Sequence, residues 1–398
     1  MKKPKKNYWE ERSRMSNIPK LRFPEFSGKW EEKTIDSMFD EIREKNHPTE
    51  EVLTIIQGSG TIPRKESGRN IIYDEKSLSN YKYVQENDFI IHLRSFEGGL
   101  EIANSNGIVS PAYIIMRPKL PIASRFYYSY FRSYRFINHV LPVAVEGVRD
   151  GRQIKYPILK NEKIPFPTVN EQQKIANFLS NVDSIITAET KILKTLQKKK
   201  KALMQKLFTQ QLRFKSDDGK DFPAWEEKKL GECVEILDSR RKPIESKERA
   251  NRKGEYPYYG ASGIIDYIDD YLFEGESILL GEDGANIINR NSRLAFIATG
   301  KYWVNNHAHI MIANVDNLNY FICEYLESLD YSKICAGSAQ PKLTQDVIRN
   351  LVIKRPCKEE QQKIADCLSS MDSLIQNQQK VVTTWQQRKK ALLQQMFV

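Results

Sequence analysis

The chain has 398 residues, enough for two or three globular domains, and its 40% hydrophobic and 28% charged residues exclude wholesale disorder. Lys and Arg number 62 against 51 Asp and Glu, so the net charge is +11. This charge favours a polyanionic partner, with nucleic acid ahead of an anionic membrane surface. The sequence contains no run of about 18 apolar residues, so we expect a cytoplasmic protein without a membrane span.

A first mixed α/β domain is expected at residues 21–168, after a basic N-terminal extension at residues 1–20. Apolar and β-branched runs predict its strands at residues 52–56, 89–91 and 112–116. An aromatic-rich helix is expected near residues 125–140, and Pro165 and Pro167 mark the exit from the domain.

Residues 169–211 are predicted to form a long helix, because apolar residues recur at alternating steps of four and three. A heptad pattern of this kind predicts a left-handed coiled coil. At ~1.5 Å per residue, about 35 residues make a rod of roughly 50 Å. The seam residues expected near the start of this helix are Ile175, Leu179, Val182 and Ile186.

The second half of the chain repeats this order, with a domain at residues 212–357 and a long helix at residues 358–398. The expected strands are residues 277–280, 294–297 and 309–312. An aromatic-rich helix is expected near residues 320–331, and Pro356 marks the exit. The matching seam residues of the second helix are Ile364, Leu368, Met371 and Ile375.

The two halves are an internal duplication. The run Glu171–Ala176 recurs as Glu360–Ala365, 189 residues later, and Lys200 recurs as Lys389 at the same offset. The seam positions that are polar also match, which favours two helices packed on each other over two helices packed on separate cores. The chain is therefore a twofold tandem and not a solenoid.

The sequence lacks the motifs of several enzyme classes. It contains neither a phosphate-binding G-x-x-x-x-G-K-[ST] loop nor the Asn-Pro-Pro-Tyr type motif of amino-methyltransferases. His307 and His309 could form a metal pair on one face of a strand, but no third ligand is indicated, so no metal site is expected. The five cysteines include no C-x-x-C pair, which argues against a zinc ribbon and a disulfide framework. We expect a protein without catalytic residues.

Basic and aromatic residues alternate in three segments that we expect to be loops: Arg149–Gln153, Tyr256–Gly260 and Lys301–Trp303. Arg and Lys neutralise phosphates, and Arg can also read base edges. The alternative is that these are solvated loops with core-packed tyrosines. The predicted DNA contacts are Arg94, Arg149, Arg152, Lys155, Tyr258, Tyr259, Lys301, His307 and Lys342.

The chain resembles the specificity subunits of type I restriction-modification enzymes. The residues that carry the resemblance are Glu171–Ala176 with Leu179 and Asp183 and their second copies, Leu21–Pro24 with Trp30, Tyr258–Ile264, and Gln340–Leu343. One departure is the start, because Met15 begins a stretch that looks like a more usual N-terminus.

The resemblance implies a mixed α/β fold with two similar target-recognition domains, held apart by an antiparallel coiled coil in a pseudo-twofold arrangement. Each domain would read one half of a bipartite sequence in double-stranded DNA. The helices would dock two modification subunits, which use S-adenosylmethionine to methylate adenine. Two restriction subunits, which use ATP and Mg, would join them. This chain itself would need no cofactor, because catalysis would belong to the partners.

Two other hypotheses stay open at this point. The chain could be a DNA methyltransferase or nuclease that acts alone, although the missing methylase motif speaks against it. It could also be a coiled-coil adaptor without DNA specificity, although two divergent basic and aromatic domains speak against that.

Overall fold

The computed structural model describes residues 18–68, 75–147, 152–335 and 341–397. It divides into two compact units: unit 1 comprises Met1–Thr190 and Lys380–Val398, and unit 2 comprises Lys191–Gln379. Each unit contains one mixed α/β domain and part of each long helix. The predicted fold class, with two similar domains and two long helices, is confirmed.

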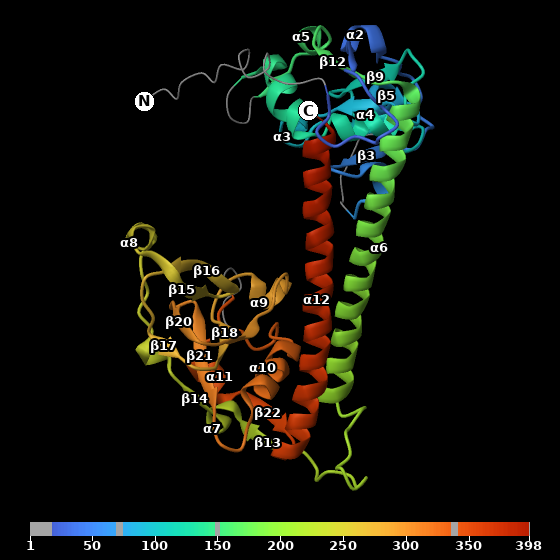
Figure 1. Ribbon diagram of the computed structural model, residues 1–398. Coiled ribbons are helices and arrows are strands. Elements are labelled where there is room, and N and C mark those ends of the chain that lie inside the picture. The colour runs from blue at the N-terminus through green and yellow to red at the C-terminus, as the bar shows by residue number, and fades with distance from the viewer. Residues whose placement is uncertain (1–17, 69–74, 148–151, 336–340, 398) are drawn as a thin grey trace. The chain divides into compact units, whose positions relative to one another are not determined.

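The centre of unit 1 is an antiparallel sheet of four strands in the order β2-β9-β6-β7. Strand β9 of this sheet is labelled in Figure 1. These strands are β2 (Phe39–Ile42), β9 (Ile114–Pro118), β6 (Phe89–Ile91) and β7 (Glu101–Ile102). The two-stranded pairs are β1 (Glu31–Thr34) with β12 (Lys163–Phe166), β3 (Leu53–Ile56) with β4 (Gly60–Pro63), β5 (Lys82–Val84) with β8 (Gly107–Val109), and β10 (Val145–Glu146) with β11 (Gln153–Ile154). The short helices are α2 (Ile35–Met38), α3 (Ser95–Gly98), α4 (Ser124–Tyr130) and α5 (Tyr156–Leu159).

The aromatic helix predicted at 125–140 is interrupted. Helix α4 ends at Tyr130, and a separate π-helical turn follows at Phe136–Val140. In an uninterrupted α-helix Phe131 and Phe136 would point in different directions, because five residues turn by about 500°. The break brings their ring centroids to 4.9 Å and buries both side chains in the core of unit 1.

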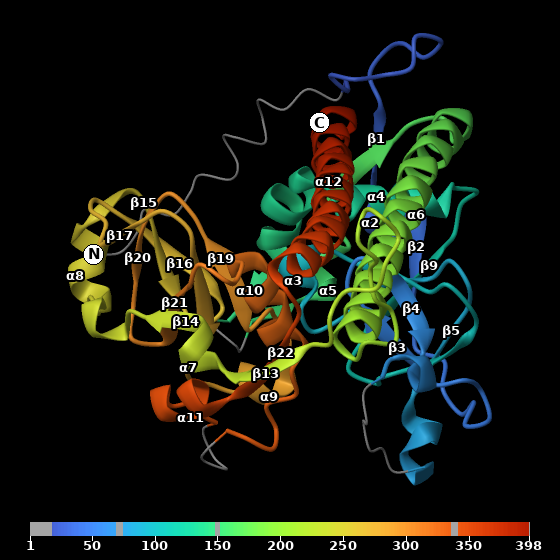
Figure 2. The same ribbon diagram turned by 90° about the horizontal axis from the view of Figure 1, so that it is seen from below.

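Unit 2 contains a sheet of the same order, β14-β21-β18-β19, and a second sheet of order β16-β15-β20-β17 (Figure 2). The strands of the first are β14 (Val234–Ile236), β21 (Ala308–Ala313), β18 (Ser277–Gly281) and β19 (Ala295–Ala298). Those of the second are β16 (Gly263–Ile268), β15 (Lys253–Gly260), β20 (Lys301–Val304) and β17 (Phe273–Glu274). The remaining elements are the pair β13 (Glu226–Lys229) and β22 (Val352–Arg355), with helices α7 (Leu230–Cys233), α8 (Ser246–Asn251), α9 (Asn286–Asn289), α10 (Asn319–Ser328) and α11 (Gln345–Asn350).

The second sheet corrects two predictions. The segments Tyr256–Gly260 and Lys301–Trp303 were expected to be loops, but they lie in the paired strands β15 and β20. Successive side chains of a strand point to opposite faces, and the successive residues Tyr302 and Trp303 are both buried, in two different clusters, so β20 is covered on both faces. Tyr258 pairs with Trp303 in this parallel ladder, and both are buried.

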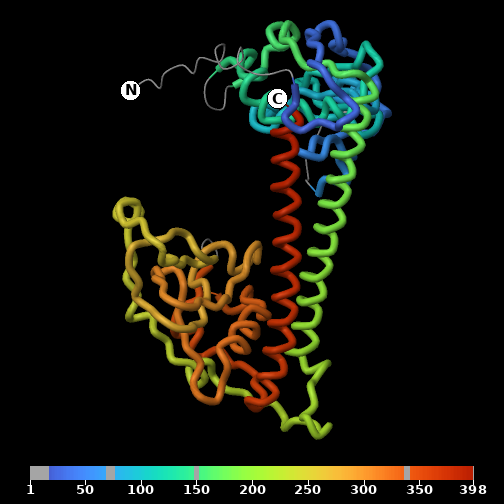
Figure 3. Tube along the Cα trace, in the orientation of Figure 1, coloured from blue at the N-terminus to red at the C-terminus, as the bar shows by residue number. Residues whose placement is uncertain are grey.

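The long helices are α6 (Val169–Phe208), with 40 residues, and α12 (Lys358–Met396), with 39 residues. Each is about 60 Å long. In unit 1 the start of α6 lies beside the end of α12, running in the opposite direction (Figure 3), and Asp183 forms an ion pair with Lys389 there. In unit 2 Lys200 forms the matching ion pair with Asp372. Among the described residues, no helix is both long and apolar enough to cross a membrane.

The first seam residues of each helix belong to the core of a domain. Ile175 and Leu179 are 1% exposed and pack with Met396 and Phe397 in the core of unit 1. Ile364 and Leu368 take the same places in the core of unit 2. Of the other predicted seam residues, Val182 is buried, whereas Ile186, Met371 and Ile375 are partly exposed.

Candidate nucleic-acid interface

The two sheets of equal order bring equivalent chain segments together. Ile91, the last residue of β6, pairs with Ile114, so the segment that begins at His92 leaves the sheet beside Tyr113. In unit 2 Gly281, the last residue of β18, pairs with Ala308, so Glu282 leaves beside His307. Four of the nine predicted contacts lie near these two strand ends: Arg94, Arg152, His307 and Lys342.

In unit 1, two arginines lie beside α3. Arg94 directly precedes the helix and is exposed. The Arg152 guanidinium lies 4.2 Å from the centre of the Phe96 ring, a cation–π distance. Lys155 directly follows β11, and its ammonium is 3.9 Å from Glu146 Oε2. Exposed cations beside an aromatic ring suit a nucleic acid. Arg149 lies outside the described residues.

In unit 2, the equivalent place carries both signs of charge. His307 Nδ1 is 2.8 Å from Asp283 Oδ2, and Lys342 Nζ is 3.2 Å from Glu282 Oε1. Arg241 donates a hydrogen bond of 2.8 Å to the other oxygen of Glu282. Burial alone would raise the pKa of Glu282, but the Arg241 hydrogen bond and the neighbouring positive charges hold it below its usual value. The structure thus brings together His307 and Lys342 of the predicted set.

The other predicted contacts of unit 2 lie elsewhere. Tyr258 is 1% exposed, and its hydroxyl accepts a hydrogen bond from the backbone N–H of Ile244. This prediction is corrected, because Tyr258 is a core residue and offers no surface to a partner. Tyr259 is partly buried against Phe296, and burial raises its pKa. Lys301 is exposed, with its ammonium 4.5 Å from the centre of the Tyr271 ring.

Asp238, Glu282 and His309 form a cluster whose ligand atoms lie within 4.8 Å of one another. His309 Nδ1 is 2.5 Å from Asp238 Oδ2, and its Nε2 is 2.8 Å from the carbonyl oxygen of Leu343. Both ring nitrogens of His309 therefore face acceptors. Arg241 contacts both carboxylates. A metal ion would compete with this guanidinium, so the cluster is best described as an ion-pair network. His307 and His309 have separate partners and do not form the metal pair considered above.

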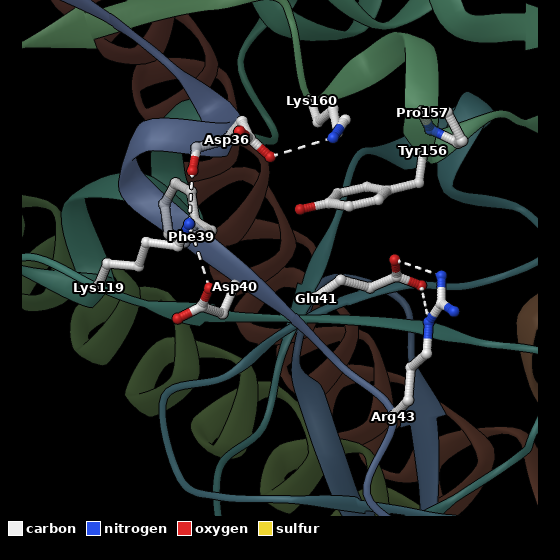
Figure 4. Close-up of a pocket in the computed structure, with 9 residues that line it drawn as sticks. All are labelled: Asp36, Phe39, Asp40, Glu41, Arg43, Lys119, Tyr156, Pro157 and Lys160. Carbon is white, nitrogen blue, oxygen red and sulfur yellow. Dashed lines mark hydrogen bonds and ion pairs between the residues drawn. The ribbon is translucent and has the colours of Figure 1, made fainter.

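A hollow of about 250 Å³ opens on unit 1 beside Tyr156 (Figure 4). Its ion pairs are Asp36–Lys160 at 3.4 Å, Asp40–Lys119 at 3.1 Å and Glu41–Arg43 at 2.7 Å. Burial and then the nearby carboxylates raise the pKa of Tyr156 to about 12. Because each carboxylate has a cationic partner, the hollow is not a basic site for a polyanion.

A turn at residues 57–60 joins β3 to β4, as the turn-like run Gly58–Gly60 indicates, but Gln57 was not among the predicted contacts. Gln57 of this turn is exposed and lies against Gly98, the last residue of α3. The available signal was the pair Gly58 and Gly60, whose φ angles are +87° and +82°. Two glycines in the left-handed region separated by one residue indicate a turn of fixed shape.

Comparison with known proteins identifies the family. The family model for the type I restriction modification DNA specificity domain matches residues 27–198 and 224–384. A Haemophilus influenzae protein named as a type I restriction enzyme specificity subunit is 34% identical over 147 residues, which is 37% of each chain. The alignment with that relative thus spans just over a third of its length.

Other similarities extend over more of the chain. The MjaVIII specificity subunit of a type I restriction enzyme from Methanocaldococcus jannaschii is 26% identical over 337 residues, 78% of each chain. The crystal structure of the S subunit of a type I restriction-modification system from M. genitalium has a TM-score of 0.59 and 18% identity. That similarity covers 96% of this chain and 99% of the other, and it shows the shared fold.

Proposed function

Because the chain belongs to the type I restriction-modification DNA specificity family, we propose that unit 1 and unit 2 each read one half of a bipartite target in double-stranded DNA. One observation carries this proposal. The two central sheets have the same strand order, and the segment that leaves β6 in unit 1 takes the place that the segment leaving β18 takes in unit 2. Their side chains differ, with Arg94 and Arg152 in unit 1 and Glu282 with Lys342 in unit 2. Similar frames with different surface chemistry suit two different half-sites.

The side chains at the end of β6 and at the end of β18 suit different bases. Arg reads guanine bidentately and also contacts phosphates, whereas a carboxylate accepts a hydrogen bond from the amino group of cytosine. The arginines of unit 1 therefore suit guanine or phosphate. Asp283 suits a base with an exposed amino group, while Lys342 and His307 offset the repulsion between the carboxylates of this end and the DNA backbone.

The partners follow from the same proposal. The antiparallel pair of α6 and α12 sets the distance between half-sites and docks two modification subunits, which methylate adenine with S-adenosylmethionine. Two restriction subunits supply ATP-dependent cleavage. The chain is a recognition subunit without catalysis, in line with relatives that are named specificity subunits.

The test is to co-express the chain with the modification subunit encoded beside it and to map methylated adenines in host DNA by single-molecule sequencing. We expect a bipartite motif with a fixed gap and one methylated adenine in each half. Lys155→Ala should weaken methylation of targets read through the first half. Lys119→Ala, at an exposed lysine that follows the opposite end of β9, should not. A stable complex that methylates no bipartite sequence would contradict the proposal.

A further inference from the structure

The turn at residues 57–60 of unit 1, called here the Gln57 turn, is held by a buried carboxylate. Glu101 Oε1 accepts a hydrogen bond of 2.7 Å from the backbone N–H of Gly58, and Oε2 accepts one of 3.0 Å from Gly60. The hydroxyl of Tyr128 donates a third, at 2.9 Å. Glu101 is 0% exposed. A buried carboxylate is costly unless it is fully hydrogen-bonded, and two of the three bonds here fix one short turn.

The carbonyl oxygens of the turn are also held by side chains. Asn104 Nδ2 donates to the carbonyl oxygens of Ser59, at 2.7 Å, and Thr61, at 3.0 Å. Arg132 Nη1 donates to the carbonyl oxygen of Gly58 at 3.1 Å. A Cβ on Gly60 would lie 2.6 Å from the carbonyl oxygen of Ile102, so only glycine fits there. These hydrogen bonds from the rest of the domain therefore hold the backbone of the turn in one conformation.

Two side chains on this fixed turn, Gln57 and Ser59, are exposed. The Gln57 carboxamide lies over Gly98, where a Cβ would collide with its nitrogen. Gly98 ends the same short helix that Arg94 precedes, beside the stacked pair of Phe96 and Arg152. The neutral carboxamide of Gln57 thus lies near Arg94 and Arg152, whose guanidinium groups suit phosphates.

We propose that Gln57 is a specificity-determining residue of unit 1 and that its carboxamide reads an adenine in the major groove. A glutamine amide donates to N7 and accepts from the N6 amino group of adenine, a pairing that no other base offers. Because the turn is already ordered, little conformational entropy is lost on binding. This inference rests on the proposed function and names a residue that carries it.

The test uses the full chain in complex with its modification subunit and the same methylation mapping. Gln57→Ala should reduce the preference for adenine at one position of one half-site by about 10- to 100-fold and leave the other half unchanged. Gln57→Glu should move the preference at that position towards cytosine, because a carboxylate only accepts hydrogen bonds. A purely structural role would not change base preference in this way. The matched control is Gln85→Ala, an exposed glutamine in the turn before the other end of β6.

Gly98→Ala supplies an independent variant. Its new methyl group would displace the Gln57 carboxamide while the helix is kept, so the same position should lose its preference. In the Gln57→Ala background the substitution should have no further effect, because nothing is left to displace.

The outcomes separate the two proposals. A wild-type complex without any bipartite motif would overturn the proposed function and this inference with it. A wild-type motif that Gln57→Ala leaves unchanged at every position, or weakens uniformly, would overturn the inference alone.

Discussion

Lys200 explains why the heptad seam of α6 contains a polar residue. Its ammonium lies 2.6 Å from Asp372 Oδ1 and 2.8 Å from Glu324 Oε2, with only 7% of the side chain exposed. The hydroxyl of Tyr320 donates to the other oxygen of Asp372 at 2.5 Å, and burial followed by this hydrogen bond raises the pKa of Tyr320. A buried ion pair of this kind fixes the register of the two helices, because any shift along the helix would leave its charges buried without a partner.

The duplicated lysine provides a matched comparison. Lys389 pairs with Asp183 in unit 1, but the two side chains are 21% and 48% exposed. Lys200→Met should therefore lower the free energy of unfolding by about 3–5 kcal/mol, since it removes the buried cation that Glu324 and Asp372 share and leaves Arg293 as their remaining cationic partner. Lys389→Met should cost no more than about 1 kcal/mol. Urea unfolding of both variants checks this, and equal losses would show that burial does not decide the strength of these pairs.

The network around His309 predicts a response to acid. Burial alone would raise the pKa of Asp238, but the hydrogen bond and charge of His309 hold it below its usual 3.8. A depressed carboxyl pKa stabilises the folded state above the usual value, and this stabilisation is lost as the pH falls through the lower folded value. Unit 2 should therefore loosen below about pH 4.

Native-state hydrogen exchange between about pH 7 and about pH 3 would measure this, after correction for the intrinsic exchange rate. Peptides from β14 and β21 should lose protection as the acid form of Asp238 appears. In Asp238→Asn the dependence on pH over this range should flatten. An unchanged dependence in that variant would assign the acid response to other groups.

At the scale of elements, the long helices and the central strands could be predicted because their patterns are local. A heptad repeat gave α6 and α12, and apolar runs gave β6 and β18. The glycines of the Gln57 turn indicated a turn, but its fixed shape could not be predicted, because Glu101 lies 43 residues after Gly58 and 41 after Gly60. Strand β15 was also missed, since Pro257 and three tyrosines in one segment are as typical of a loop as of a strand.

The residue that follows α12 completes the core of the domain in unit 1. Phe397 is 2% exposed, and its ring centroid lies 5.3 Å from that of Phe126 and 5.8 Å from that of Tyr130. Phe397→Ala should lower the free energy of unfolding of unit 1 by about 3–5 kcal/mol, because it leaves a cavity among aromatic rings. Faster hydrogen exchange in α4 and β6 would report the change.

Phe208 is the duplicated counterpart and serves as the control. It packs on Phe321 and Tyr325 in unit 2, and it is partly exposed. Phe208→Ala should increase exchange in α10 of unit 2, with a smaller loss of stability. If Phe397→Ala increased exchange in both units equally, the units would not unfold separately.

At the scale of the whole molecule, the duplication preserves the contacts that join each domain to its following helix. Arg22 Nε lies 2.7 Å from Glu171 Oε1, and Arg213 Nη2 lies 2.6 Å from Glu360 Oε2. Gln172 accepts a hydrogen bond from the backbone N–H of Ala123, as Gln361 does from that of Leu318. Because each domain has its own set of contacts with its following helix, the surface of one domain can change without altering the structure of the other.

Exchange of one domain should therefore change one half of the DNA target. Replacing residues 21–168 with the equivalent domain of another specificity subunit should alter one half-site and leave the other half and the gap unchanged. The donor must supply an arginine at position 22 and aromatic residues at 126 and 130, because these contact Glu171 and Phe397. Exchange of residues 212–357 is the reciprocal control and should alter only the other half. Methylation mapping of both chimaeras decides the question, since a single exchange that changed both halves would mean that the two domains read DNA as one surface.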